Sequence, residues 1–216
     1  MLTEANGNLS KEKRMINDAI RAVEERVFQK LQIDWDVDLL VTNRLRDIII
    51  PEDGVGGRAI SSDFAELAID EGRATENLIS EILAHELCHA ARWGKNDEWA
   101  SSLLDNIICE GIATYFEAKY AANREERTVF IKTVLSRSDD ENMQILKRLQ
   151  DQLGLSSYNY NDIFFDGNNK LPRWSGYSLG YYLVKKYLEI TGKKIEDAFA
   201  DEYGVFKYNL EAVLVA

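Results

Sequence analysis

The hydrophobic pattern changes its period along the chain, and this change constrains the fold more than any other feature. Apolar and polar residues alternate from Trp35 to Thr42, and short apolar runs follow at residues 48–50 and 64–70. Such patterns are typical of strands. Beyond Gly72 most apolar residues recur every three to four positions, as in amphipathic helices. The sequence therefore predicts an α+β fold with a small N-terminal sheet at 35–70 and a mainly helical remainder.

Individual helices can be placed from the same periodicity. A first helix is expected from an N-cap at Ser10, with its apolar stripe running to Leu31. Later helices are expected at residues 76–93, 99–122, 124–137, 141–153 and 176–191, with shorter pieces at 195–201 and 210–215 and a long loop at 154–172. Gly94 and Gly192 are expected to end two of these helices. The glycine-rich stretch 52–58 predicts a tight turn or a close approach to a ligand.

Composition narrows the class of protein. The chain has 26 basic and 37 acidic residues and a net charge of −11, which argues against a nucleic-acid partner. It has no apolar run long enough to span a membrane and does not open with a signal-like pattern. We therefore expect a cytoplasmic protein with no membrane partner and unknown oligomeric state. One domain is predicted over 1–216, comprising a sheet region at 35–70, a metal-binding helix pair at 76–122 and a helical part at 123–216.

Both histidines of the chain stand in one pentapeptide, His85-Glu-Leu-Cys-His89, within a helical pattern. Residues four apart on a helix are separated by about 40° around its axis, so both imidazoles point into the same space and can bind one metal ion. Glu86 lies about 60° from His89, a position suited to a general base acting on water at the metal. The alternative is a helix with a partly exposed polar edge. Cys88 and Cys109 are expected to be inert core thiols.

A catalytic zinc site needs a third protein ligand. Glu110 is the candidate, because a carboxylate in the apolar stretch Ile107-Ile-Cys-Glu110-Gly-Ile-Ala-Thr-Tyr-Phe116 is costly unless it is paired or binds a metal. The interval after His89 allows a turn and a returning helix, and Gly111 is expected to let the two metal-binding helices approach closely. The alternative for Glu110 is a partly buried salt bridge.

These motifs resemble those of gluzincin metallopeptidases, the thermolysin-like group in which His-Glu-x-x-His is followed by a ligand Glu on a second helix. The chain is more closely similar to an uncharacterised bacterial family of predicted zinc-dependent proteases. The matching features are His85-Glu-Leu-Cys-His89, Glu110-Gly-Ile-Ala113 and Trp174-Ser-Gly-Tyr-Ser-Leu-Gly-Tyr181, over roughly residues 50 to 190. The resemblance implies a zincin-like fold with an edge strand along the cleft, for which Phe64 to Asp70 is the expected segment, and an extended peptide as substrate.

One position departs from the gluzincin pattern. Gluzincins often carry an Asp four residues after the ligand Glu, hydrogen-bonded to a metal-binding imidazole, whereas this chain has Thr114 there. A hydroxyl accepts such a bond more weakly, and Glu117, about one turn further on, is the candidate replacement.

The expected reaction is hydrolysis of peptide bonds in a peptide or protein, with one Zn²⁺ held by His85, His89 and Glu110. The developing oxyanion needs a further donor. No third histidine exists, so a tyrosine is expected: Tyr177 first, Tyr181 second. Tyr177 also has a packing interpretation as a core aromatic. The rival function is a zinc-stabilised binding or regulatory module with latent or no peptidase activity.

Overall fold

A computed structural model describes residues 3–5, 9–45, 47–120 and 125–215. The chain divides into two compact units. The first unit consists of Met1–Lys95 with Phe116–Ile131, and the second of Asn96–Tyr115 with Lys132–Ala216. The single domain expected over 1–216 stays a prediction. No helix within the described ranges has both the length and the apolar character needed to cross a membrane.

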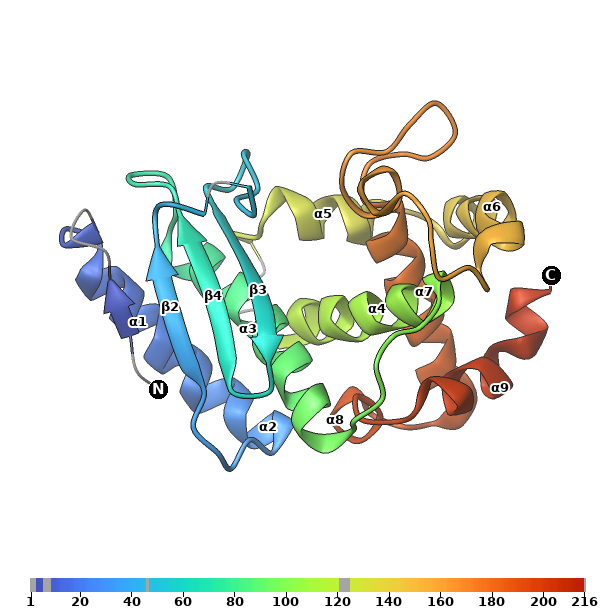
Figure 1. Ribbon diagram of the computed structural model, residues 1–216, viewed down its shortest axis with the longest axis horizontal. Coiled ribbons are helices and arrows are strands. Elements are labelled where there is room, and N and C mark those ends of the chain that lie inside the picture. The colour runs from blue at the N-terminus through green and yellow to red at the C-terminus, as the bar shows by residue number, and fades with distance from the viewer. Residues whose placement is uncertain (1–2, 6–8, 46, 121–124, 216) are drawn as a thin grey trace. The chain divides into compact units, whose positions relative to one another are not determined.

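The first unit contains a four-stranded sheet with the order β1-β2-β4-β3 (Figure 1). Its strands are β1 (Thr3–Ala5), β2 (Asp38–Thr42), β3 (Val55–Ser61) and β4 (Phe64–Ile69). β2 runs parallel to β1 and β4, and β3 is antiparallel to β4. The sheet and the many helices described below confirm the α+β class, and β2 and β4 fall inside two of the predicted strand segments.

The third predicted strand, at residues 48–50, is wrong. That segment lies in turns, where it makes only an isolated bridge between Ile50 and Val55. The glycine-rich stretch 52–58 forms the predicted turn at residues 52–54, where Gly54 has a φ of 68°, and then provides the first residues of β3. Residues 48–50 pack directly on the backbone of β3 at Gly56. A Cβ on Gly56 would lie 1.8 Å from the carbonyl oxygen of Ile48, so only glycine permits this approach.

The position of the strand at 64–69 also differs from the expectation. β4 lies between β2 and β3, so it is an interior strand, and β3 is the edge strand on that side of the sheet. Phe64 to Asp70 is therefore not the edge available to an extended peptide. The sequence pattern did not reveal this because glycines weaken the apolar alternation of β3.

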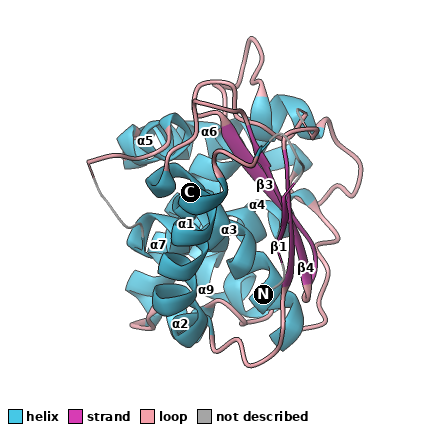
Figure 2. Cartoon of the chain, turned by 90° about the vertical axis from the view of Figure 1, so that its left-hand side faces the viewer, coloured by secondary structure: helices cyan, strands magenta, loops and turns pink. Residues whose placement is uncertain are grey.

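Helices α1 (Lys13–Val23) and α3 (Glu76–Lys95) lie against one face of the sheet (Figure 2). α1 continues into a π-helical segment, η2 (Glu24–Phe28), and α2 (Gln29–Leu31). The predicted apolar stripe of this first helix is buried at Ile16, Ala19, Ile20, Val23, Val27 and Leu31.

Two predicted helix ends are wrong. Ser10 is not the N-cap of α1, because the helix begins at Lys13 and Glu12 occupies the cap position. Gly94 does not end α3. A Cβ there would lie 2.4 Å from the Trp35 ring, so this glycine is explained by packing against an aromatic side chain.

The remaining helices are α4 (Leu103–Tyr120), α5 (Val129–Ser136), α6 (Asp139–Leu149), α7 (Ser175–Thr191), α8 (Ile195–Ala198) and α9 (Tyr203–Leu214). Two short pieces, η3 (Gln150–Gln152) and η4 (Asn161–Phe165), lie between α6 and α7. α4 begins four residues later than expected, and α9 begins well before the predicted 210–215. Gly192 adopts a left-handed conformation, with φ of 70°, and ends α7 as predicted.

Within the second unit, α4 and α7 approach closely through two glycines. A Cβ on Gly111 would lie 2.3 Å from the backbone of Gly180, and a Cβ on Gly180 would lie 2.2 Å from the carbonyl oxygen of Ile107. Gly111 therefore allows α7 to approach α4, whereas the sequence analysis expected it to serve the approach of the two metal-binding helices. Gly180 permits the same close approach from the side of α7.

The start of α4 is fixed by a capping arrangement. The Ser102 hydroxyl accepts a hydrogen bond from the Asp105 amide at 3.2 Å, and Asp105 Oδ2 accepts one from the Ser102 amide at 3.1 Å. Lys207 Nζ of α9 lies 2.5 Å from Asp105 Oδ1. Burial alone would raise the pKa of Asp105, but the hydrogen bonds from Lys207, Ser102 and Ser101 outweigh burial and lower the pKa.

We predict that Asp105→Asn lowers the free energy of unfolding by about 1 to 3 kcal/mol at pH 7, because it removes a charge-assisted cap. A depressed folded-state pKa contributes stability above the ordinary pKa and loses it as the pH falls through the folded value. The difference between wild type and variant should therefore shrink below about pH 4. Chemical denaturation across pH measures this. Asp140→Asn, an exposed change in the first turn of α6, is the control; a gap that did not depend on pH would contradict the assignment.

Candidate metal centre

The two histidines lie on the buried part of α3 with their rings turned toward one another. Residues 79–92 of this helix are buried without interruption. His85 Nε2 and His89 Nε2 are 3.2 Å apart, and the ring centroids are separated by 4.9 Å. The two Nε2 atoms, each with a lone pair or a proton, therefore lie close together in a site that excludes most water.

This spacing fits a zinc ion. Zinc binds imidazole nitrogen at about 2.0 to 2.1 Å with tetrahedral geometry, so two nitrogens on one zinc lie about 3.3 Å apart. The observed separation is 3.2 Å. The nitrogen set suits zinc chemically as well, because neutral imidazole is a preferred ligand of this ion.

Aromatic side chains of the first unit hold both imidazoles. The His89 ring stacks on Trp93, with centroids 5.8 Å apart, and the His85 ring meets Phe130 edge to face at 6.3 Å. These contacts restrict rotation of the rings, so the two nitrogens remain facing each other.

Glu117 orients His85 from α4. His85 Nδ1 lies 2.8 Å from Glu117 Oε2, and the Glu117 side chain is fully buried. A carboxylate that accepts the Nδ1 proton leaves the Nε2 lone pair for a metal. The bond considered for Thr114 is not made: among the described residues, the buried Thr114 hydroxyl oxygen has no hydrogen-bond partner. The carboxylate that orients this imidazole is therefore three residues further along α4 than in the gluzincin pattern.

Glu86 is held against the edge strand. Its Oε2 accepts a hydrogen bond from the Ala59 amide of β3 at 2.7 Å. Gly57 makes room for this contact, because a Cβ there would lie 2.7 Å from Glu86 Cγ and 3.0 Å from Ile82 Cγ2. The close approach expected of the glycine-rich stretch is thus made to a side chain of α3.

Glu110 completes a group that could hold a metal ion together with His85 and His89, each residue offering one ligand atom. Glu110 and Glu117 are seven residues apart on α4, so they lie within about 20° of the same face of that helix. Because Glu117 contacts His85, this face is the one on which a third ligand is expected. Within the second unit, the Glu110 carboxylate accepts a hydrogen bond from the Tyr160 hydroxyl at 3.3 Å.

Burial dominates the electrostatics around these groups. It raises the pKa of Glu117, against the opposing effect of His85, and raises the pKa of Tyr160, assisted by the Glu110 carboxylate. Glu81, one turn before His85 on α3, has its pKa raised to about 8 by burial and by Glu117. Arg127 Nε lies 3.5 Å from Glu81 Oε1 and opposes this shift. Burial thus favours the neutral forms of these acidic groups over their charged forms.

Tyr177 and Tyr181, the two predicted oxyanion donors, lie on α7. The Tyr177 ring meets Phe164 edge to face at 5.5 Å, and the Tyr181 ring stacks on Tyr115 at 5.3 Å. The Arg173 guanidinium lies over the Trp174 ring, 3.9 Å from its centroid. Trp174 is buried and adopts a left-handed backbone conformation before α7, with φ of 60°. The oxyanion role of Tyr177 stays a prediction.

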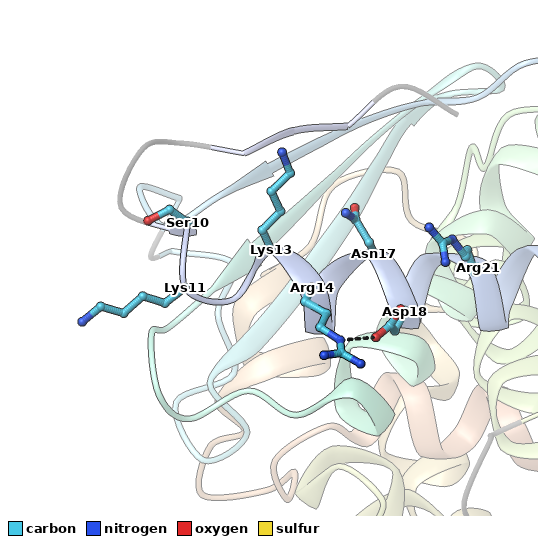
Figure 3. A pocket seen from close by; sticks show the side chains of 7 residues that line it. All are labelled: Ser10, Lys11, Lys13, Arg14, Asn17, Asp18 and Arg21. Carbon is cyan, nitrogen blue, oxygen red and sulfur yellow. Dashed lines mark ion pairs between the residues drawn. The ribbon is translucent and has the colours of Figure 1, made fainter.

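A surface hollow beside α1 has a different character. It is lined by Ser10, Lys11, Lys13, Arg14, Asn17, Asp18 and Arg21 (Figure 3). Arg14 Nε is 3.7 Å from Asp18 Oδ2, and the Arg14 side chain is 95% exposed. None of the candidate site residues lines the hollow.

The comparison with known protein families agrees with the metal site expected from the sequence motifs. The family model described as "Predicted Zn-dependent protease (DUF2268)" matches residues 16–207. The chain belongs to this family. No curated protein and no solved structure gives a significant match. The match extends beyond residues 50–190 and includes most of α1 and the beginning of α9.

Membership in the predicted Zn-dependent protease family agrees with the zinc expected at His85 and His89. Two hydrogen bonds of the candidate site were not predicted from the sequence. The hydrogen bond from Tyr160 to Glu110 comes from the segment 154–172, which was expected only to be a long loop. The bond from Ala59 to Glu86 involves a backbone amide, which no side-chain pattern reports. Anticipating this hydrogen bond would have required the prediction of a strand at residues 55–61.

We predict that Glu117→Gln weakens zinc binding by about 10- to 100-fold, because the orienting acceptor of His85 loses its charge. Thr114→Val is the matched change on the same helix. It removes a buried hydroxyl that makes no hydrogen bond to any residue that the structure describes, so zinc affinity should stay at the wild-type value and stability should not fall. Competition against a zinc-binding dye measures both affinities. Weaker binding in Thr114→Val with no effect of Glu117→Gln would contradict the assignment of the orienting residue.

Proposed function

We propose that the protein hydrolyses peptide bonds with one zinc ion bound by His85, His89 and Glu110, and that it is a gluzincin-type peptidase with a zincin-like fold. The observation that carries the proposal is the 3.2 Å separation of the two Nε2 atoms on a buried helix. The family description supports the zinc dependence and the protease activity. The proposed substrate is a peptide or protein.

Zinc in this site would acidify water, bringing its pKa to about 7, and would polarise the peptide carbonyl. Glu86 is proposed as the general base. It accepts a proton from the attacking water and returns it to the nitrogen of the leaving amine, so the carboxylate is regenerated at the end of each turnover.

The surroundings of Glu86 support this assignment. The Ala59 amide binds Oε2 at 2.7 Å, and the side chain is buried between α3 and β3. A hydrogen bond to a fixed backbone group orients the carboxylate before substrate arrives, which reduces the reorganisation needed for proton transfer. A purely structural zinc site would have no use for a carboxylate oriented in this way.

Tyr177 is proposed as the donor that stabilises the oxyanion. Its ring lies between two aromatic neighbours, Phe164 at 5.5 Å and Phe165 at 6.2 Å, which fix its orientation. Tyr181 follows one turn later on α7 and provides the matched alternative.

The base is tested by Glu86→Gln, which keeps the shape of the side chain and removes its basicity. Zinc content should remain near one per chain, while cleavage of an unstructured protein such as casein should fall by at least about 100-fold. His89→Ala is the companion variant and should lose zinc but keep its helical circular dichroism, because a core of this size does not depend on the metal. Equal cleavage by wild type and Glu86→Gln would exclude Glu86 as the base.

The oxyanion donor is tested by comparing Tyr177→Phe with Tyr181→Phe. Loss of a hydroxyl that contacts only the transition state should cost about 2.7 to 4 kcal/mol there, which is about 10²- to 10³-fold in kcat with little change in KM. Steady-state kinetics on one peptide measure both constants. A large loss in Tyr181→Phe alone would move the role by one turn, and no loss in either would assign the charge to another donor.

A further inference from the structure

The carboxylate of Glu110 is held by a hydroxyl from a separate segment of the second unit. Tyr160 Oη donates to Glu110 Oε1 at 3.3 Å. Tyr160 immediately precedes η4, fifty residues after Glu110 in the sequence. The hydrogen bond uses one of the two carboxylate oxygens of Glu110, and its donor lies next to η4.

The Tyr160 ring is fixed by stacking. It lies parallel to Phe164, with centroids 4.4 Å apart and planes inclined by 20°. Phe164 is fully buried and packs on α7, where a Cβ on Gly176 would lie 2.5 Å from its ring. Gly176 therefore lets α7 hold the ring on which Tyr160 stacks. A rigid ring presents its hydroxyl at a defined position, so the hydrogen bond can orient its acceptor.

We propose that Tyr160 is a positioning residue for the metal site: its hydroxyl occupies one oxygen of Glu110 and keeps the other directed to zinc as a monodentate ligand. This inference rests on the proposed function, because it takes Glu110 to be the third ligand.

The chemistry of a zinc carboxylate gives the reason. A carboxylate without a second partner can rotate or bind through both oxygens, and the second oxygen then fills a position that water needs in a catalytic site. A hydrogen bond to one oxygen restricts that rotation. Partners of this kind typically change metal affinity by about 10- to 100-fold when they are removed.

The experiment is zinc affinity in Tyr160→Phe, measured by competition with a chromophoric chelator on the full chain. The variant keeps the stacked ring and loses only the hydroxyl. We expect the zinc dissociation constant to rise by about 10- to 100-fold. Tyr158→Phe is the matched control, because Tyr158 neighbours Tyr160 in the same aromatic group, with centroids 6.3 Å apart. That variant should bind zinc as the wild type does.

A positioning role is separated from a structural one by a double-mutant cycle with Glu110→Ala. If Tyr160 acts through Glu110, Tyr160→Phe has no further effect on the residual affinity of Glu110→Ala. Equal losses in both backgrounds would overturn the proposal. The visible spectrum of the Co²⁺-loaded protein gives a second readout, because a change of Glu110 from one to two bound oxygens changes the coordination number of cobalt.

The outcomes also separate this inference from the proposed function. Wild-type affinity in Tyr160→Phe, together with loss of affinity in Glu110→Ala, would overturn the role of Tyr160 and leave the metal site standing. Unchanged affinity in Glu110→Ala would instead remove Glu110 from the ligand set, and the inference would fail with it. Melting of the metal-free variants shows whether each is folded.

Discussion

The burial of α3 is the constraint on which the candidate site depends. Its residues 79–92 are buried without interruption, although they include two histidines and two glutamates. Polar groups removed from water must find partners or the fold loses stability. His85 is met by Glu117, Glu86 by the Ala59 amide, and the two imidazoles by each other. The donor and acceptor roles in the contact between the imidazoles depend on their tautomers, and a cation between them would bind the lone pairs of both nitrogens.

Glycines bring the backbones close enough for these contacts. Gly57 allows Glu86 to reach β3, and Gly180 brings α7 onto α4 beside Gly111. Gly176 accommodates Phe164, which in turn supports the Tyr160 ring. In each case a methyl group would overlap an atom of the neighbouring segment. Single glycines thus allow neighbouring segments to come close enough to orient side chains of α3 and α4.

The sequence predicted those parts of the structure whose information is local. The His85 and His89 spacing follows from helix geometry alone, and the alternation at residues 38–42 follows from a half-buried strand. Glu117 could be anticipated because it lies on the same helix as Glu110. β3 was missed because its glycines carry no apolar pattern, and its position at the edge of the sheet depends on pairing between segments. Tyr160 was missed for the same reason: its partner lies fifty residues earlier in the chain.

We propose that His85, His89 and Glu110 together bind one catalytic zinc ion. Metal analysis of the purified protein, beside Glu110→Ala prepared in the same way, tests it most directly. We expect one zinc per wild-type chain and a clear loss in the variant, with the helical circular dichroism of both unchanged. A wild-type protein that holds no zinc after equilibration with the ion, or a variant that retains it with full affinity, would contradict this ligand set.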